Sequence, residues 1–118
     1  VIQYEENPNR YEKLTDENFI LVSMAHSSYM KYSERFAEYL HKEFGNHPTL
    51  SSRGVKQAGF YVLVGASMPS VLIESGFLSN TNDAKHLSTS SGQQKFAEYV
   101  FNGIKKYRES YELEMQDE

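Results

Sequence analysis

Two short apolar runs, which lie between two long stretches with helical periodicity, constrain the fold of this chain most. The runs are "GFYVLVG" at 59–65 and "SVLIE" at 70–74, rich in β-branched and aromatic residues and flanked by glycine or proline. This composition is typical of strands. Because their apolar character is nearly continuous rather than alternating, they favour a sheet covered on both faces. The sequence therefore predicts an α/β fold with two core strands.

The stretch before these runs has the periodicity of a long amphipathic helix. Apolar residues recur at helical spacing from Val22 to Phe44, and Gly45 follows as a stop signal. We therefore predict a helix over residues 17–44. Residues 1–16 are polar and show no sustained period, so we expect them to form an irregular arm.

The stretch after the runs predicts two more helices. Residues 82–87 favour a short helix, and "SSGQQ" at 90–94 resembles a capping box, with Ser90 or Ser91 three residues before a glutamine. Apolar residues then recur at helical spacing to about residue 110, before an acidic tail at 113–118. Two strands with these helices are too few for a doubly covered sheet, so the pattern indicates half of a layered α/β domain.

The size and composition of the chain exclude several classes of protein. Its 118 residues suit one domain, and a net charge of -4 without a basic block gives no electrostatic footprint for nucleic acid. The absence of cysteine removes disulfides and thiolate metal sites. No apolar run approaches the roughly 20 residues that span a bilayer. The sequence begins without Met or a signal peptide, so we expect a processed product or a piece of a longer protein.

Glu74 is the main candidate for chemistry. It ends the second apolar run, where an ionised carboxylate without a partner is costly to bury, and open α/β sheets place their sites at the carboxyl ends of strands. A half-buried place disfavours the charged form, which suits a general acid or base. The structural alternative is a carboxylate that caps backbone N–H groups or pairs with Arg53. The local sequence does not decide between the two.

Arg53 is the candidate for ligand binding. It precedes Gly54 in a loop before the first apolar run, where a guanidinium can orient a carboxylate of a ligand or of the protein itself. The alternative is a solvated loop arginine. Asn80, by contrast, is typical of a turn or a helix cap.

The four histidines give no metal site. His26, His41, His47 and His86 lack the spacing that places two imidazoles on one ion. Glu38 and His41 have the i, i+3 spacing of helical carboxylate metal sites, but this spacing occurs once. We interpret all four histidines as surface residues and assign no metal ligand in this chain.

A longer pattern carries a family resemblance. The run "RGVKQAGFYVLVGASMPSVLIESGFLSN", followed by "DAKHLSTSSGQQKFAEYVFNGIKKY", closely resembles the C-terminal half of the zinc-dependent N-acetylmuramoyl-L-alanine amidases, which hydrolyse peptidoglycan. The family pattern is an Arg-Gly-Val-Lys element, a strand, and Pro-x-Val-Leu-x-Glu-x-Gly-Phe-x-Ser-Asn. Residues 53–56 and 69–80 match it position by position. The resemblance covers about residues 17–110.

The resemblance implies a fold and a chemistry. The fold would be a three-layer α/β/α domain, with residues 17–112 as the C-terminal part of its catalytic domain. Glu74 would be the catalytic acid/base beside a zinc ion, acting on the amide between N-acetylmuramic acid and L-alanine, and Arg53 would bind substrate. The partners would be peptidoglycan or muropeptides, and the location would be the cell envelope, periplasmic or secreted.

The resemblance also implies what this chain lacks. The family's zinc ligands, two histidines and a glutamate, belong to an N-terminal half that this sequence does not contain. "SMAHSS" at 23–28 is superficially similar to one of those elements, but His26 falls within the helical pattern. The zinc ion would therefore belong to the intact enzyme, and this chain alone would be inactive. The alternatives are a noncatalytic amidase-like binding or regulatory module and a purely structural fragment.

Overall fold

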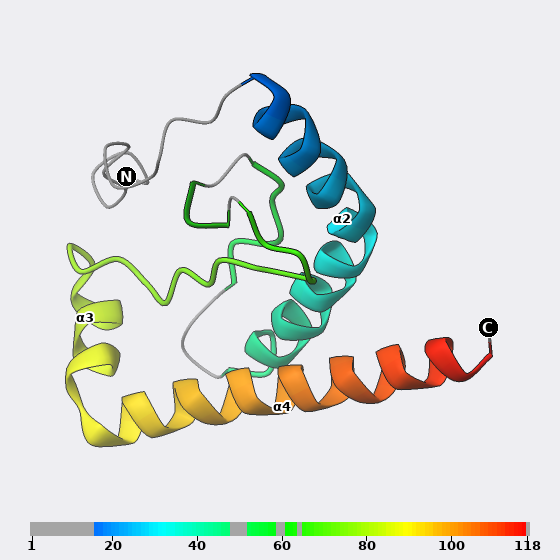
Figure 1. The fold of residues 1–118 in the computed structure, drawn as a ribbon. Coiled ribbons are helices and arrows are strands. Elements are labelled where there is room, and N and C mark those ends of the chain that lie inside the picture. Colours follow the sequence, from blue (N-terminus) through cyan, green and yellow to red (C-terminus); the bar gives the residue numbers. More distant parts are fainter. Residues whose placement is uncertain (1–15, 48–51, 59–60, 64, 118) are drawn as a thin grey trace. The chain divides into compact units, whose positions relative to one another are not determined.

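Helices and irregular segments make up the described part of the protein. The computed structural model describes residues 16–47, 52–58, 61–63 and 65–117. Its elements are helix α2 (Asp16–Phe44), the short 3₁₀ helix η2 (Tyr61–Leu63), helix α3 (Thr81–Ser88) and helix α4 (Ser90–Gln116) (Figure 1). The chain divides into two compact units. One takes the described residues up to Glu34 and Lys56–Leu72, and the other takes Arg35–Val55 and the residues from Ile73 onward.

The predicted α/β fold with two core strands is wrong for this structure, because no described residue lies in a β-strand. Within the first predicted strand, residues 61–63 form η2, while 59, 60 and 64 lie outside the described residues. The second predicted strand, residues 70–74, is irregular. The layered α/β/α domain implied by the family resemblance is therefore not seen here either.

At the start of the second apolar run, a side chain takes a backbone donor that a strand would use. A strand requires a neighbouring strand to receive its backbone hydrogen bonds. Here the N–H of Ser70 donates to Oγ of Ser33 at 2.9 Å, and the N–H of Phe77 donates to Oδ2 of Asp83 at 3.0 Å. Leu72 is 38% exposed, so the run is not covered on both faces. An apolar run alone thus does not fix a strand when a ladder partner is missing.

The helix predictions fare better. α2 covers the predicted 17–44 and ends before Gly45, whose N–H still donates to the carbonyl of His41 at 3.0 Å. α3 confirms the predicted short helix with one extra residue at each end. The predicted capping box of α4 at Ser90 or Ser91 is wrong: Thr89 is the N-cap, its Oγ1 accepts the N–H of Gly92 at 3.1 Å, and glycine has no side chain to return the bond. α4 also continues to Gln116, beyond the predicted end near 110.

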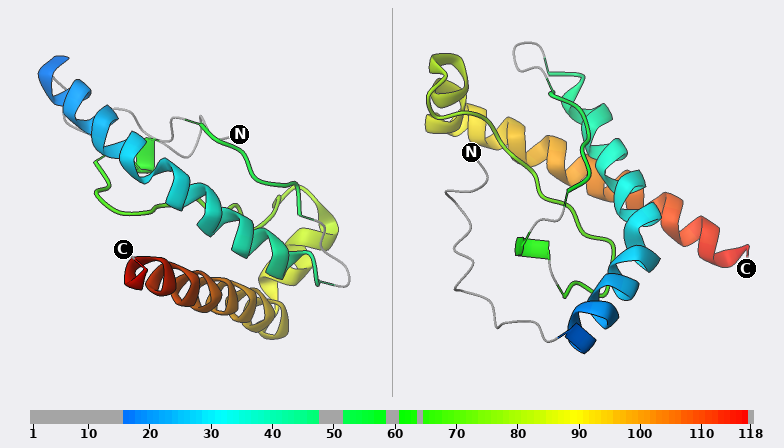
Figure 2. Two further views of the ribbon diagram at one scale, coloured as in Figure 1. Left: turned by 90° about the vertical axis from the view of Figure 1, so that its right-hand side faces the viewer. Right: turned by 90° about the horizontal axis from the view of Figure 1, so that it is seen from above.

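The core of the second unit lies between the later half of α2 and α4. Leu40 and Tyr107 are its buried apolar side chains, and Phe36 stacks on Tyr107 with ring centroids 4.7 Å apart. Gly103 of α4 faces Leu40 so closely that an added Cβ would lie 3.2 Å from the Cα of Leu40. A side chain at this position would push the two helices apart. Figure 2 shows this half of α2 alongside α4.

Two ion pairs join the same helices. Lys106 pairs with Glu43, whose side chain is 7% exposed, and Arg35 pairs with Glu114 near the end of α4. The hydrogen bond from Arg35 to Glu114 is the main cause that raises the pKa of the guanidinium above its ordinary value. The contact at Glu114 also explains why α4 stays helical into the sequence predicted to be an acidic tail.

Candidate functional site

Glu74 lies in the irregular segment that leads to α3. Its side chain is exposed, whereas that of Ile73 before it is half-buried. The predicted half-buried position of this carboxylate is therefore wrong in this structure. An exposed carboxylate remains open to water and to a bound ligand.

A turn anchors the residues after Glu74 to the start of α3. The N–H of Phe77 donates to Oδ2 of Asp83 at 3.0 Å, and the N–H of Asp83 donates to Oδ1 of Asn80 at 3.0 Å. Asn80 is thus the N-cap of α3, which confirms the predicted cap. Gly76 permits this approach, because its φ is +152° and an added Cβ would lie 3.2 Å from Cβ of Asp83.

Arg53 lies against this anchored turn. Its guanidinium carbon is 4.6 Å from the centroid of the Phe77 ring, a cation–π contact. Arg53 is exposed and Phe77 is half-buried. The structure therefore brings the Arg-Gly loop to a residue three positions after Glu74. No ion pair joins Arg53 to Glu74 in the described part of the chain, so the structural alternative of a direct pair is not seen.

The loop that carries Arg53 is also held beside α2. Oγ of Ser52 lies 2.6 Å from Nδ1 of His41, and the same oxygen accepts the N–H of Gly54 at 3.2 Å. The Ser52 hydroxyl, directly before Arg53, thus contacts both His41 of α2 and the backbone of Gly54, directly after Arg53. This arrangement limits the positions that the Arg53 side chain can reach.

The histidines do not build a metal centre within the described residues. No group of three His, Asp or Glu side chains there could hold a metal ion. His41 contacts Ser52, and His47 and His86 pack edge to face with ring centroids 5.1 Å apart. The side chain of His26 lies outside the described part. Glu38 is exposed and belongs to no such group.

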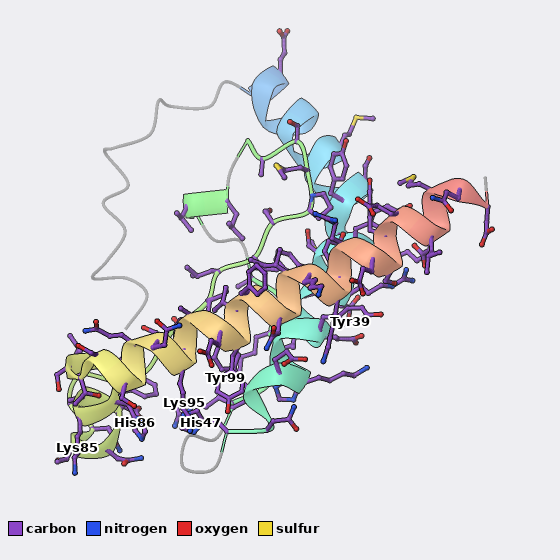
Figure 3. The ribbon with its side chains drawn as sticks, turned by 90° about the horizontal axis from the view of Figure 1, so that it is seen from below. Tyr39, His47, Lys85, His86, Lys95 and Tyr99 are labelled. Atoms are coloured by element: carbon purple, nitrogen blue, oxygen red, sulfur yellow. The ribbon has the colours of Figure 1, made fainter. Side chains whose placement is uncertain are left out.

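A cluster around His47 disfavours the protonated form of this side chain. His47 follows α2 and contacts His86 of α3 and Tyr99 of α4, the latter with ring centroids 5.5 Å apart. Figure 3 shows these three residues and Lys95 of α4 gathered together. Burial lowers the pKa of His47 from its ordinary value of 6.5, and the positive charges of His86 and Lys95 lower it further. Protonated His47 is therefore disfavoured in the folded state.

We expect the folded protein to lose stability as the pH falls below about 6.5 toward the lowered pKa of His47. Above that value both states carry a neutral His47, but below it the unfolded state binds the proton more readily. Urea unfolding at pH 7 and pH 5 measures this difference. His47→Gln should lose part of the dependence on pH that the unchanged protein shows. Equal loss of stability in both proteins would contradict the assignment to His47.

Two residues of this site escape prediction from sequence. The N–H of Phe77 donates to the carboxylate of Asp83, and the ring of Phe77 contacts Arg53, which lies 24 positions earlier in the chain. The spacing of Asn80 and Asp83 at a helix start is a signal that could have identified Asp83. No local pattern predicts the contact between Phe77 and Arg53.

Comparison with known proteins identifies the family. The model of the N-acetylmuramoyl-L-alanine amidase family matches residues 5–106, which include the Arg53 loop and the Glu74 segment. The chain belongs to the N-acetylmuramoyl-L-alanine amidase family. The sequence resemblance to these amidases is thereby confirmed. No solved structure matches the chain.

Three relatives from Bacillus subtilis and Escherichia coli show the extent of the similarity to this amidase-family chain. It is 40% identical to the uncharacterized protein YqiI of Bacillus subtilis over 75 residues, 64% of this chain and 36% of that protein. It is 34% identical to the amidase AmiC of Escherichia coli O6:H1 over 87 residues, 74% of this chain and 21% of the relative. It is 36% identical to the amidase LytC of Bacillus subtilis over 75 residues, 64% of this chain and 15% of the relative.

The matched part of the chain spans 15 to 36% of the length of these three relatives. The family assignment thus applies to this chain, while the activity of a whole protein involves more sequence than is matched. Among the described residues, no helix combines the length and the apolar character needed to cross a bilayer.

Proposed function

We propose that the intact protein hydrolyses the amide bond between N-acetylmuramic acid and L-alanine in peptidoglycan, with Glu74 as its general acid/base. The family match over residues 5–106 is the observation that carries this proposal. It is supported by the names of the amidases AmiC and LytC, to which the chain is similar. We propose the cell envelope, either periplasmic or secreted, as the location of the intact protein, because its proposed substrate is peptidoglycan.

The chemistry of amide hydrolysis gives Glu74 two tasks. The attacking water must lose a proton, and the leaving amine must gain one, because an amide anion is a poor leaving group. One carboxylate can do both in sequence, first as a base and then as an acid. The exposure of Glu74 supports this role, since water and substrate can reach its oxygens.

Arg53 is proposed to bind the substrate. Its guanidinium is exposed and lies over Phe77, on a turn that begins directly after the Glu74 segment. A guanidinium has several N–H donors in one plane and recognises carboxylates better than a lysine does. Arg53 would thus hold the substrate while Glu74 moves protons.

Zinc dependence is proposed for the intact protein from the family resemblance, with a donor set that the described residues do not provide. A catalytic zinc site uses three protein ligands, and no group of three suitable side chains occurs in the described part of this chain. When bound, the ion would supply Lewis-acid polarisation of the amide and a more acidic water. We place its ligands upstream and expect this chain alone to be inactive.

The bond that is cut distinguishes this function from its rivals. The intact protein should be incubated with purified peptidoglycan, and new amino groups and new reducing sugar ends should be measured together. We expect amino groups to accumulate while reducing ends stay constant. New reducing ends would indicate a glycosidase instead. Sedimentation of the protein with peptidoglycan, without new amino groups, would support a noncatalytic binding module.

A further inference from the structure

We propose that Phe77 is a positioning residue that holds the Arg53 guanidinium toward a carboxylate of the substrate peptide. This inference rests on the proposed function, because it concerns the substrate of the same site. It adds a residue that sequence analysis does not single out, and it names a chemical class: N-acetylmuramoyl peptides with a free carboxylate near the bond that is cut.

The contact between Arg53 and Phe77 orients the guanidinium and leaves its N–H groups available to donate hydrogen bonds to a ligand. The guanidinium carbon lies 4.6 Å from the ring centroid of Phe77. A cation–π contact uses the face of the aromatic ring and the positive charge. The N–H donors of a guanidinium point outward in its own plane, so they stay directed toward other partners. Arg53 is exposed, which leaves room for a ligand at that edge.

Phe77 can orient Arg53 because its own backbone is fixed. Its N–H donates to Oδ2 of Asp83 at 3.0 Å, and Asp83 lies in the first turn of α3. The φ of +152° at Gly76, where an added Cβ would lie 3.2 Å from Cβ of Asp83, disfavours any other residue before Phe77. The position of the Phe77 ring is thereby fixed by the hydrogen bond to the first turn of α3.

The other side of Arg53 is fixed as well. Ser52 contacts His41 of α2 at 2.6 Å and accepts the N–H of Gly54 at 3.2 Å. A long side chain that is held at its backbone and at its tip loses less entropy when it binds a ligand. A planar fork prepared in this way matches the two oxygens of a carboxylate. An exposed guanidinium with no such support would discriminate less between a carboxylate and a neutral amide.

The test compares two soluble ligands that differ in one group: an N-acetylmuramoyl peptide with a free carboxylate and the same peptide as its carboxamide. Binding is measured by calorimetric titration of the intact protein that carries Glu74→Gln, so that turnover does not consume the ligand. We expect the carboxylate form to bind about 10-fold more tightly. Phe77→Leu should reduce this preference about 2-fold to 5-fold, and Phe77→Tyr should retain it.

Matched variants separate positioning from general packing. Phe101 of α4 is 65% exposed, so Phe101→Leu makes the same chemical change elsewhere and should leave the preference intact. In an Arg53→Gln background the preference should be lost, and Phe77→Leu should then have no further effect on it. If Phe77→Leu does not fold, Arg53→Lys replaces it as the test, because it keeps the charge but loses the planar fork.

An equal affinity for both ligands, or a preference that a folded Phe77→Leu protein leaves unchanged, would overturn the inference. That result is independent of catalysis. If Glu74 proves unnecessary for turnover, the proposed function fails while a carboxylate preference due to Arg53 and Phe77 still stands. If turnover depends on Glu74 but no carboxylate preference exists, this inference alone fails.

Discussion

Replacing Glu74 by glutamine in the intact protein is expected to lower kcat for N-acetylmuramoyl peptide hydrolysis by about 100-fold to 10,000-fold. Glutamine keeps the size and the polar character of the side chain but cannot accept a proton from water. KM should change little, because Arg53 and the rest of the substrate contacts are retained. Glu74 is exposed, so the substitution should also leave folding stability nearly unchanged.

The matched control for this change is Glu109→Gln on the exposed face of α4. It removes the same charge from the same chain and should leave kcat and KM unaltered. Steady-state kinetics on both variants, with thermal unfolding measured in parallel, make the comparison. A Glu74→Gln protein with the kcat of the unchanged enzyme would exclude Glu74 as the group that moves protons. Loss of activity accompanied by unfolding would contradict the expected stability of the variant.

The second large effect is expected at Lys106. Lys106→Met should lower the free energy of unfolding by about 2 to 3 kcal/mol, because it leaves the Glu43 carboxylate buried without its partner. The side chain of Glu43 is 7% exposed, whereas that of Lys106 is 56% exposed. We therefore expect a loss at or below the lower limit of the roughly 3 to 5 kcal/mol that is typical of broken buried pairs, since water can reach the lysine side. Urea unfolding at constant pH measures the loss.

Two further variants test whether the charge of Lys106 is the cause. Lys105→Met changes the neighbouring exposed lysine of α4 and should have little effect on stability. Adding Glu43→Gln to Lys106→Met should recover part of the loss, because the unpaired charge is then removed. A Lys106→Met protein as stable as the Lys105→Met protein would show that the pair with Glu43 contributes nothing measurable.

The helices could be predicted from sequence because their signals are local. The apolar stripe up to Phe44 and the stop at Gly45 fix α2, and the side chain of Asn80 caps α3. The extension of α4 to Gln116 was missed, because its contact with Arg35 through Glu114 comes from a distant part of the chain. Local patterns do not report such contacts.

The prediction of strands failed because a strand, unlike a helix, depends on non-local partners. The run at 70–74 is apolar and β-branched, but a strand depends on a partner that local sequence does not name. Its first residue, Ser70, instead donates its N–H to Ser33, and three residues beyond the run the N–H of Phe77 is taken by Asp83. The prediction that Glu74 is half-buried fails for the same reason, because it assumed that Glu74 ends a strand of a covered sheet, whereas the side chain is exposed.

The candidate site was predicted in part. The residues chosen from sequence, Glu74 and Arg53, both lie in the second unit, and Arg53 contacts the turn after Glu74. Phe77, which makes that contact, enters the sequence analysis only as the phenylalanine of the family pattern, with no role assigned to it. An aromatic residue that supports a cation is indistinguishable from a core residue until the cation is placed beside it in space.

The most direct test of the account is the fate of oxygen from water. The intact protein should hydrolyse a defined N-acetylmuramoyl peptide in ¹⁸O-labelled water, with the products analysed by mass spectrometry. We predict one labelled oxygen in the new carboxylate on the lactyl group of N-acetylmuramic acid, a free amine on L-alanine, and loss of both products with Glu74→Gln. Label at a sugar carbon or at another peptide bond, or undiminished label with Glu74→Gln, would contradict the account.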